Sequence, residues 1–142
     1  MTKKRVLFVC IHNSARSQMA EELLRQMAGE HFEVESAGLE PGKLNPLAVE
    51  VLKEKGIDIS GKQTQDVFEL YKQGRRYNYV VTVCDGASGE RCPIFPGAVE
   101  TLHWPFEDPS SLAGPHEERL AKTRRVRDQI EATIRNWLST NP

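Results

Sequence analysis

The feature that most constrains this chain is the continuous apolar run at residues 6–10, which ends in a cysteine and is followed six residues later by an arginine. An unbroken run of this kind predicts a β-strand buried on both faces, as in parallel sheets. Beyond the arginine, apolar side chains recur at helical spacing from Met19 to Met27. The segment therefore predicts a strand, a tight loop, and an amphipathic helix over residues 17–29.

The short loop between this strand and helix has the size and chemistry needed to enclose one tetrahedral oxyanion. The start of the helix would direct backbone N–H groups and the positive end of the helix dipole into the loop. Arg16 would add a two-pronged guanidinium, and Asn13 tolerates the left-handed backbone that a tight loop needs. The predicted oxyanion-binding residues are Ile11, His12, Asn13, Ser14, Ala15, Arg16 and Ser17.

Cys10 stands at the end of the strand, directly below the predicted oxyanion site. The loop would stabilise a thiolate there, because a thiolate is itself an anion beside a helix N-terminus and an arginine. The alternative is that Cys10 is a small core residue at a strand end, the commonest fate of a lone cysteine. The buried strand before it, the helix after it, and Arg16 and Ser17 together favour a nucleophile.

Length and charge limit the classes of protein to which the chain can belong. Its 142 residues fit a single domain, 1–142, and no linker divides them. The formal charge of -1, from 19 Lys+Arg and 20 Asp+Glu, gives no general attraction to nucleic acid or to an acidic membrane. No apolar run approaches the roughly 20 residues of a membrane span, and the first residues do not resemble a signal peptide. We therefore expect a cytoplasmic protein, and a monomer.

The chain contains three cysteines, Cys10, Cys84 and Cys92. An odd, small number in a cytoplasmic chain favours thiol chemistry over a disulfide framework. A zinc site is disfavoured because the cysteines lack a Cys-x2-Cys pair and the histidines are scattered. The sequence therefore predicts no transition metal.

The remaining segments alternate between strand and helix patterns. Strands are predicted at 32–38, 77–83 and 99–104, and helices at 46–56, from 64–66 onward and at 115–138, with Arg124, Arg125 and Arg127 on the outer face of the last. This alternation predicts an open α/β sheet with helices on both faces. Because Cys84 follows a strand as Cys10 does, both thiols are expected at one edge of the sheet. A polar, glycine-containing loop is expected between Cys84 and Cys92.

The loop at residues 9–17 resembles the active-site loop shared by low-molecular-weight protein tyrosine phosphatases and thioredoxin-coupled arsenate reductases. Its sequence is Val9-Cys10-Ile11-His12-Asn13-Ser14-Ala15-Arg16-Ser17, and the longer run from Asn13 to Glu21, which continues with Gln18-Met19-Ala20-Glu21, resembles the reductases more closely. His12 stands where glycine is common and Ala15 where a second cysteine is common, but neither change alters Cys10 or Arg16. The resemblance covers nearly the whole chain and implies a four-stranded open parallel sheet in a single domain.

The resemblance also implies roles for residues outside the loop. It implies that Asp108, in an Asp-Pro pair, is the general acid that protonates the leaving oxygen. It implies that Cys84 and Cys92 form a redox pair. In that scheme Cys10 attacks arsenate, Cys84 attacks Cys10 as arsenite leaves, and Cys92 then forms with Cys84 a disulfide that thioredoxin reduces. The implied activity is reduction of arsenate to arsenite, with phosphate and sulfate as competing oxyanions.

Two alternatives and one cofactor remain open at this stage. A phosphatase of the same fold would hydrolyse phosphomonoesters through Cys10 but would give Cys84 and Cys92 no task. A protein that only senses oxyanions would need no nucleophile and no general acid. Some reductases of this family bind potassium near the loop, so potassium is an expected ion, with ordinary hydrogen bonding as the other interpretation. The matching residues are Asn13, Glu21, Ser36 and Asp66.

Overall fold

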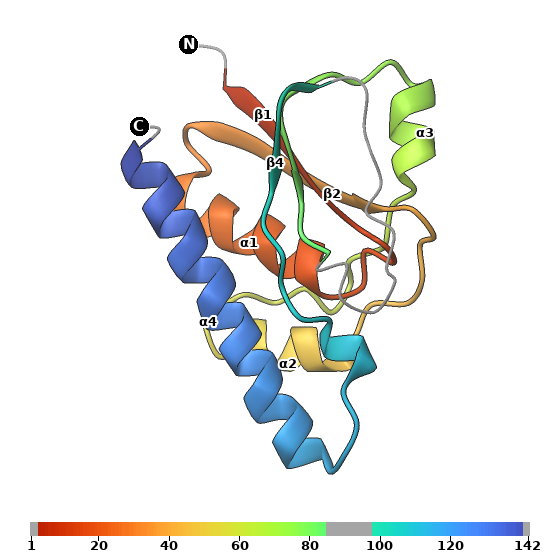
Figure 1. The fold of residues 1–142 in the computed structure, drawn as a ribbon, viewed down its shortest axis with the longest axis vertical. Helices are drawn as coiled ribbons and strands as arrows, with labels where there is room; N and C mark the ends of the chain where they lie inside the picture. The colour runs from red at the N-terminus through yellow and green to blue at the C-terminus, as the bar shows by residue number, and fades with distance from the viewer. Residues whose placement is uncertain (1–2, 85–97, 141–142) are drawn as a thin grey trace.

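The chain forms a four-stranded sheet in which every strand is parallel to its neighbours (Figure 1). The structure is a computed structural model that describes residues 3–84 and 98–140. Its strands are β1 (Lys4–Cys10), β2 (Phe32–Gly38), β3 (Tyr77–Thr82) and β4 (Ala98–His103), in the order β2-β1-β3-β4 across the sheet. β1 therefore lies between β2 and β3, and residues 6–9 are completely buried, as the apolar run predicts.

Helices cover both faces of this sheet, as expected. They are α1 (Arg16–Ala28), α2 (Pro46–Lys53), α3 (Val67–Lys72) and α4 (His116–Thr140), with a short 3-10 turn η1 (Pro109–Ser111) before α4. α1, α2 and α4 lie together on one face and α3 lies on the other (Figure 1). The larger core includes Phe8 and Ile130 under the three helices, while Val67 of α3 packs with Leu7 in a smaller one. The predicted fold class is confirmed.

Polar side chains set where the two short helices begin. Asn45 precedes Pro46, and its side chain accepts a hydrogen bond from the backbone N–H of Leu47 at 2.8 Å. Asp66 caps α3 in the same way, through the N–H of Phe68 at 2.8 Å. Both are N-caps of the kind that compensate the unpaired N–H groups of a first helical turn. The carboxylate of Asp66 is therefore engaged at the start of α3.

The 25-residue helix α4 packs along its aromatic and aliphatic face. The ring of Trp137 lies 5.4 Å from that of Phe32. The prediction that Arg127 belongs to the outer face is wrong, because the residue is 8% exposed. Its guanidinium donates to the carbonyl of Val51 at 2.8 Å and pairs with Glu54 at 2.7 Å, and these partners on and beside α2 make burial of the charge tolerable. Neither α4 nor any other helix among the described residues is apolar over a length that would span a bilayer.

Candidate active site

The predicted oxyanion loop lies between the carboxyl end of β1 and the first turn of α1. Among the described residues, Asn13 is the one non-glycine residue with positive φ, at 54°. The left-handed turn therefore falls on Asn13, and His12 needs no such backbone. No side chain caps α1, and its first turn contains no acidic residue. The positive end of the helix dipole therefore faces the loop without a neutralising carboxylate from the helix itself.

The sulfur of Cys10 is surrounded by hydrogen-bond donors of the loop. The backbone N–H of Asn13 donates to Cys10 Sγ at 3.1 Å, and the Ser17 hydroxyl lies 2.9 Å from the same atom. Because Ser17 Oγ accepts a hydrogen bond from Asn13 Nδ2 at 2.7 Å, its own hydrogen is available to the sulfur. Hydrogen bonds of this kind are stronger to a charged acceptor than to a neutral one. Cys10 is a free cysteine and is 2% exposed.

The backbone carbonyls of the loop are bonded to the segment that follows β2. Four N–H groups of this segment donate to loop carbonyls: Leu39 to Cys10 at 3.1 Å, Glu40 to Ile11 at 2.7 Å, Gly42 to His12 at 3.0 Å and Asn45 to Ser14 at 2.9 Å. The His12 ring bonds to the same segment, with Nδ1 2.8 Å from the Glu40 carbonyl. These four carbonyls are directed at residues 39–45, while the N–H of Asn13 is directed at Cys10 Sγ. A loop with its carbonyls turned outward and its N–H groups turned toward one centre has the arrangement of an oxyanion nest.

Gly38 is a site residue that sequence reasoning missed. It ends β2, where it pairs with Cys10 of β1. A Cβ atom at this position would lie 2.7 Å from the Ile11 carbonyl oxygen, 2.8 Å from Asn13 N and 2.9 Å from the His12 carbonyl carbon. All three are backbone atoms of the loop, so nothing larger than hydrogen fits. A glycine closing a predicted strand was the available signal, but it does not tell which backbone approaches.

The Asn13 side chain links the loop to α1, to β2 and to the segment before α3. Its Oδ1 accepts from the Gln65 backbone N–H at 2.9 Å and from Gln18 Nε2 at 3.1 Å, and its Nδ2 donates to Ser36 Oγ at 2.9 Å. Asn13 is completely buried, so each of these bonds satisfies a group that would be costly to leave unpaired. Gln18 and Gln65 were not predicted as site residues, because nothing in their local sequence indicates a contact with residue 13.

Arg16 and Asp108 meet at the entrance to the loop. Arg16 is 2% exposed, and its Nη1 donates to the Phe106 carbonyl at 3.1 Å while Nη2 lies 3.6 Å from Asp108 Oδ2. The backbone N–H of Ser110 donates to Asp108 Oδ1 at 2.9 Å and fixes the carboxylate at the start of η1. The Ser110 hydroxyl also accepts from Asn45 Nδ2 at 2.9 Å. The predicted general acid therefore lies beside the predicted oxyanion ligand.

Cys84 lies at the same edge of the sheet as Cys10. β1 and β3 are adjacent and parallel, with Val9 opposite Thr82, and the N–H of Val83 donates to the Val9 carbonyl at 2.9 Å. Cys84 follows directly, is completely buried, and is disulfide-bonded. Cys92 and the loop predicted at residues 85–91 lie outside the described residues.

Three of the four residues proposed to bind potassium form one hydrogen-bonded chain. The Ser36 hydroxyl accepts from Asn13 and donates to Glu21 Oε1 at 2.5 Å. The fourth, Asp66, caps α3. A residue outside the prediction, Lys62, places its ammonium 2.7 Å from the same Glu21 oxygen.

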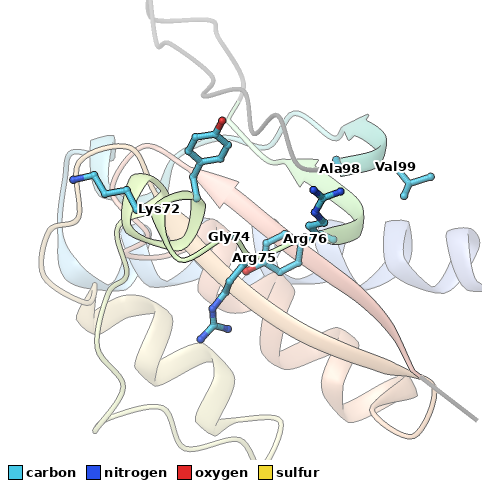
Figure 2. A pocket seen from close by; sticks show the side chains of 8 residues that line it. Lys72, Gly74, Arg75, Arg76, Ala98 and Val99 are labelled. Carbon is cyan, nitrogen blue, oxygen red and sulfur yellow. The ribbon is translucent and has the colours of Figure 1, made fainter.

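A separate hollow lies at the opposite end of β3 from this site (Figure 2). It has a volume of about 630 Å³ and lies between the end of α3 and the starts of β3 and β4. Its lining residues include Lys72, Arg75, Arg76 and Val99. Because β3 begins at Tyr77 and reaches the Cys10 edge only at Thr82, this hollow is not part of the oxyanion loop.

Comparison with known proteins gives a consistent result over the whole chain. Residues 5–141 match the family described as low molecular weight phosphotyrosine protein phosphatase. The arsenate reductases of Shouchella clausii and Bacillus subtilis are 42% and 41% identical over 140 residues, covering 99% of this chain and of each relative. A solved arsenate reductase in the phosphate-binding state matches with a TM-score of 0.76 at 28% identity, covering 96% of this chain and 98% of that one. A thioredoxin-dependent arsenate reductase from Corynebacterium glutamicum matches with a TM-score of 0.68 at 29% identity, over 99% of this chain and 62% of that one.

Proposed function

This chain belongs to the low molecular weight phosphotyrosine protein phosphatase family, and we propose that it is an arsenate reductase that uses three cysteines and takes its electrons from thioredoxin. The observation that supports this most is the placement of Cys10 and Cys84 at the same edge of adjacent parallel strands. Thioredoxin is the proposed donor because a solved structure that matches 99% of this chain, over 62% of its own length, is a thioredoxin-dependent arsenate reductase.

Arsenate binding would use the groups that the loop leaves for an anion. In this proposal the backbone N–H groups of residues 11–16 and the Arg16 guanidinium would bind the oxyanion. Cys10 Sγ, which the Asn13 N–H and the Ser17 hydroxyl contact, would attack it. Arg16 Nη2 lies 3.6 Å from Asp108 Oδ2. An arsenate dianion would compete with that carboxylate for the guanidinium, and a protonated Asp108 would then be placed to donate to the leaving oxygen.

The chemistry then proceeds through sulfur. Cys10 displaces one arsenate oxygen, which leaves as water with the proton from Asp108, and a sulfur–arsenic(V) bond forms. A Cys84 thiolate attacks Cys10 Sγ, so that a Cys10–Cys84 disulfide forms as the sulfur–arsenic bond breaks. The electron pair of that bond reduces the arsenic from the +5 to the +3 state, and arsenite leaves. Cys92 then attacks Cys84, which releases the Cys10 thiolate and forms a Cys84–Cys92 disulfide for thioredoxin to reduce. The free thiol at Cys10 together with a disulfide-bonded Cys84 is the combination expected of the enzyme awaiting its reductant.

The test follows NADPH consumption with thioredoxin, thioredoxin reductase and arsenate, beside hydrolysis of an aryl phosphate. Cys10→Ser should abolish both activities. Cys84→Ser and Cys92→Ser should stop arsenate turnover but leave any aryl phosphate hydrolysis intact, because hydrolysis needs only Cys10 and water. Full thioredoxin-coupled turnover by Cys92→Ser would refute the proposed relay.

A further inference from the structure

The contacts of Glu21 bear on whether this chain can bind the potassium ion that its family suggests. Glu21 is 5% exposed, and both its carboxylate oxygens are occupied. Oε1 accepts from the Ser36 hydroxyl at 2.5 Å and lies 2.7 Å from Lys62 Nζ, while Oε2 lies 2.5 Å from Arg25 Nη2. Two side-chain cations and one hydroxyl therefore already satisfy the Glu21 carboxylate, the one that reaches the chain of hydrogen bonds from Asn13 within residues 3–84 and 98–140.

The other residues of the expected potassium site are also engaged. Asn13 Oδ1 accepts two hydrogen bonds, from Gln65 and Gln18. The Ser36 carbonyl accepts from Gln65 Nε2 at 3.0 Å, and Asp66 Oδ1 caps α3. A bound ion would need several of these oxygens at once and would face the ammonium of Lys62 at close range. The residues present do not fit a potassium ion while Lys62 stays in place.

The Lys62 ammonium is a cation that the chain itself places beside Glu21. Its ammonium lies between Glu21 and Glu22, 2.7 Å and 3.1 Å from their Oε1 atoms, and its side chain is 26% exposed. Arg25 also pairs with Glu22. Arg25 and Lys62 therefore balance the charges of Glu21 and Glu22, at the start of the chain of hydrogen bonds. An ammonium carries the charge of a potassium ion and is close in size to a potassium ion without its hydration shell. It donates hydrogen bonds to the same oxygen atoms that would coordinate the potassium.

We propose that the ammonium of Lys62 takes the place of a bound monovalent cation, so that this enzyme supports its oxyanion loop without potassium. Lys62 would act as a positioning residue through one continuous path. Glu21 accepts from Ser36, Ser36 accepts from Asn13 at 2.9 Å, and Asn13 donates to Ser17 at 2.7 Å. Ser17 in turn lies 2.9 Å from the sulfur of Cys10. Loss of the ammonium would leave Arg25 to pair with both Glu21 and Glu22, and so one excess negative charge at the start of the path to Cys10.

The experiment compares wild type with Lys62→Met in potassium, ammonium and tetramethylammonium chlorides at equal ionic strength. The first readout is the thermal midpoint. The second is the rate of Cys10 alkylation by iodoacetamide at pH 6 in a background of Cys84→Ser and Cys92→Ser, where Cys10 is the only cysteine left. The matched control is Lys55→Met, which removes a lysine of similar exposure, 34%, whose ammonium pairs with Glu131 of α4 at 3.2 Å and not with Glu21 or Glu22.

For wild type, and likewise for Lys55→Met, the thermal midpoint and the alkylation rate should not depend on which of the three salts is present. Lys62→Met should alkylate roughly threefold more slowly in tetramethylammonium, because a charge beside the path is lost, and potassium or ammonium should restore both readouts. Lys62→Arg, which keeps the charge, should resemble wild type.

Two results would overturn the proposal. One is a wild type that potassium stabilises as strongly as it stabilises Lys62→Met, and the other is a Lys62→Met variant whose midpoint and alkylation rate are the same in all three salts. If Lys62→Met does not fold, Lys62→Gln takes its place. The comparison of wild type in the three salts needs no variant and tests the proposal in either case. The inference rests on the proposed function only for the role of Cys10, and neither readout uses arsenate, so the two can fail separately.

Discussion

The contact between Gly38 and the oxyanion loop allows the sharpest test of how this site is built. In a Gly38→Ala variant the new methyl group would lie 2.7 Å from the Ile11 carbonyl oxygen, and ordinary contact begins at 3.4 Å. The two backbones must therefore separate by about 0.7 Å, the difference between these distances. The atoms in contact are all backbone, so no side chain can rotate away to relieve the overlap.

The displacement should affect stability and catalysis unequally. Overpacking of this kind typically costs about 1–3 kcal/mol, or several degrees in the thermal midpoint of a domain of this size. Activity should fall much further, because a misplacement of about 1 Å at a catalytic group can cost on the order of a hundredfold in rate. The separation would also stretch the hydrogen bonds that residues 39–45 donate to the loop carbonyls.

Gly61→Ala is the matched control, because a Cβ there meets nothing within 4 Å. It should leave activity unchanged and stability unchanged or slightly higher. The assays are thermal and urea unfolding, thioredoxin-coupled arsenate reduction, and alkylation of Cys10. A Gly38→Ala variant with activity within twofold of wild type and an unchanged midpoint would refute the close approach. A variant that loses stability and activity in the same small proportion would point to a general loss of folding instead.

Two further predictions concern charged groups. Asp108→Asn should lower arsenate turnover by about a hundredfold to ten-thousandfold, the usual contribution of a general acid, while phosphate binding measured by calorimetry persists because the loop is intact. Hydrogen bonds from Arg124 and Arg127 lower the pKa of Glu54 from 4.5 to about 2, so its contribution to stability is present above pH 4.5 and is lost as pH falls toward 2. Glu54→Gln should therefore destabilise the protein at pH 7 by on the order of 1 kcal/mol after solvent screening, and thermal midpoints of variant and wild type should converge near pH 2.

The sequence could predict those parts of the fold and site that depend on neighbours along the chain. A strand buried on both faces and a helix with a 3.6-residue period are local patterns, and they place Cys10 and Arg16 at the two ends of one loop. The parallel order of strands then puts Cys84 at the same edge, since all parallel strands end on one side. N-caps such as Asn45 and Asp66 are equally local, because the capped N–H lies two residues away.

Only the tertiary structure decided which distant groups meet that loop. Gly38, Gln65 and Lys62 reach residues 11–21 from other parts of the chain, and their own surroundings in the sequence do not tell which residues they contact. Arg127 was misassigned for the same reason: helical spacing marks a face, but Glu54 and the Val51 carbonyl, far away in the sequence, make its burial favourable. Backbone periodicity and capping follow from bonds between near residues, whereas packing and charge pairing follow from where the folded chain brings distant atoms together, and that information appears only once the chain is folded.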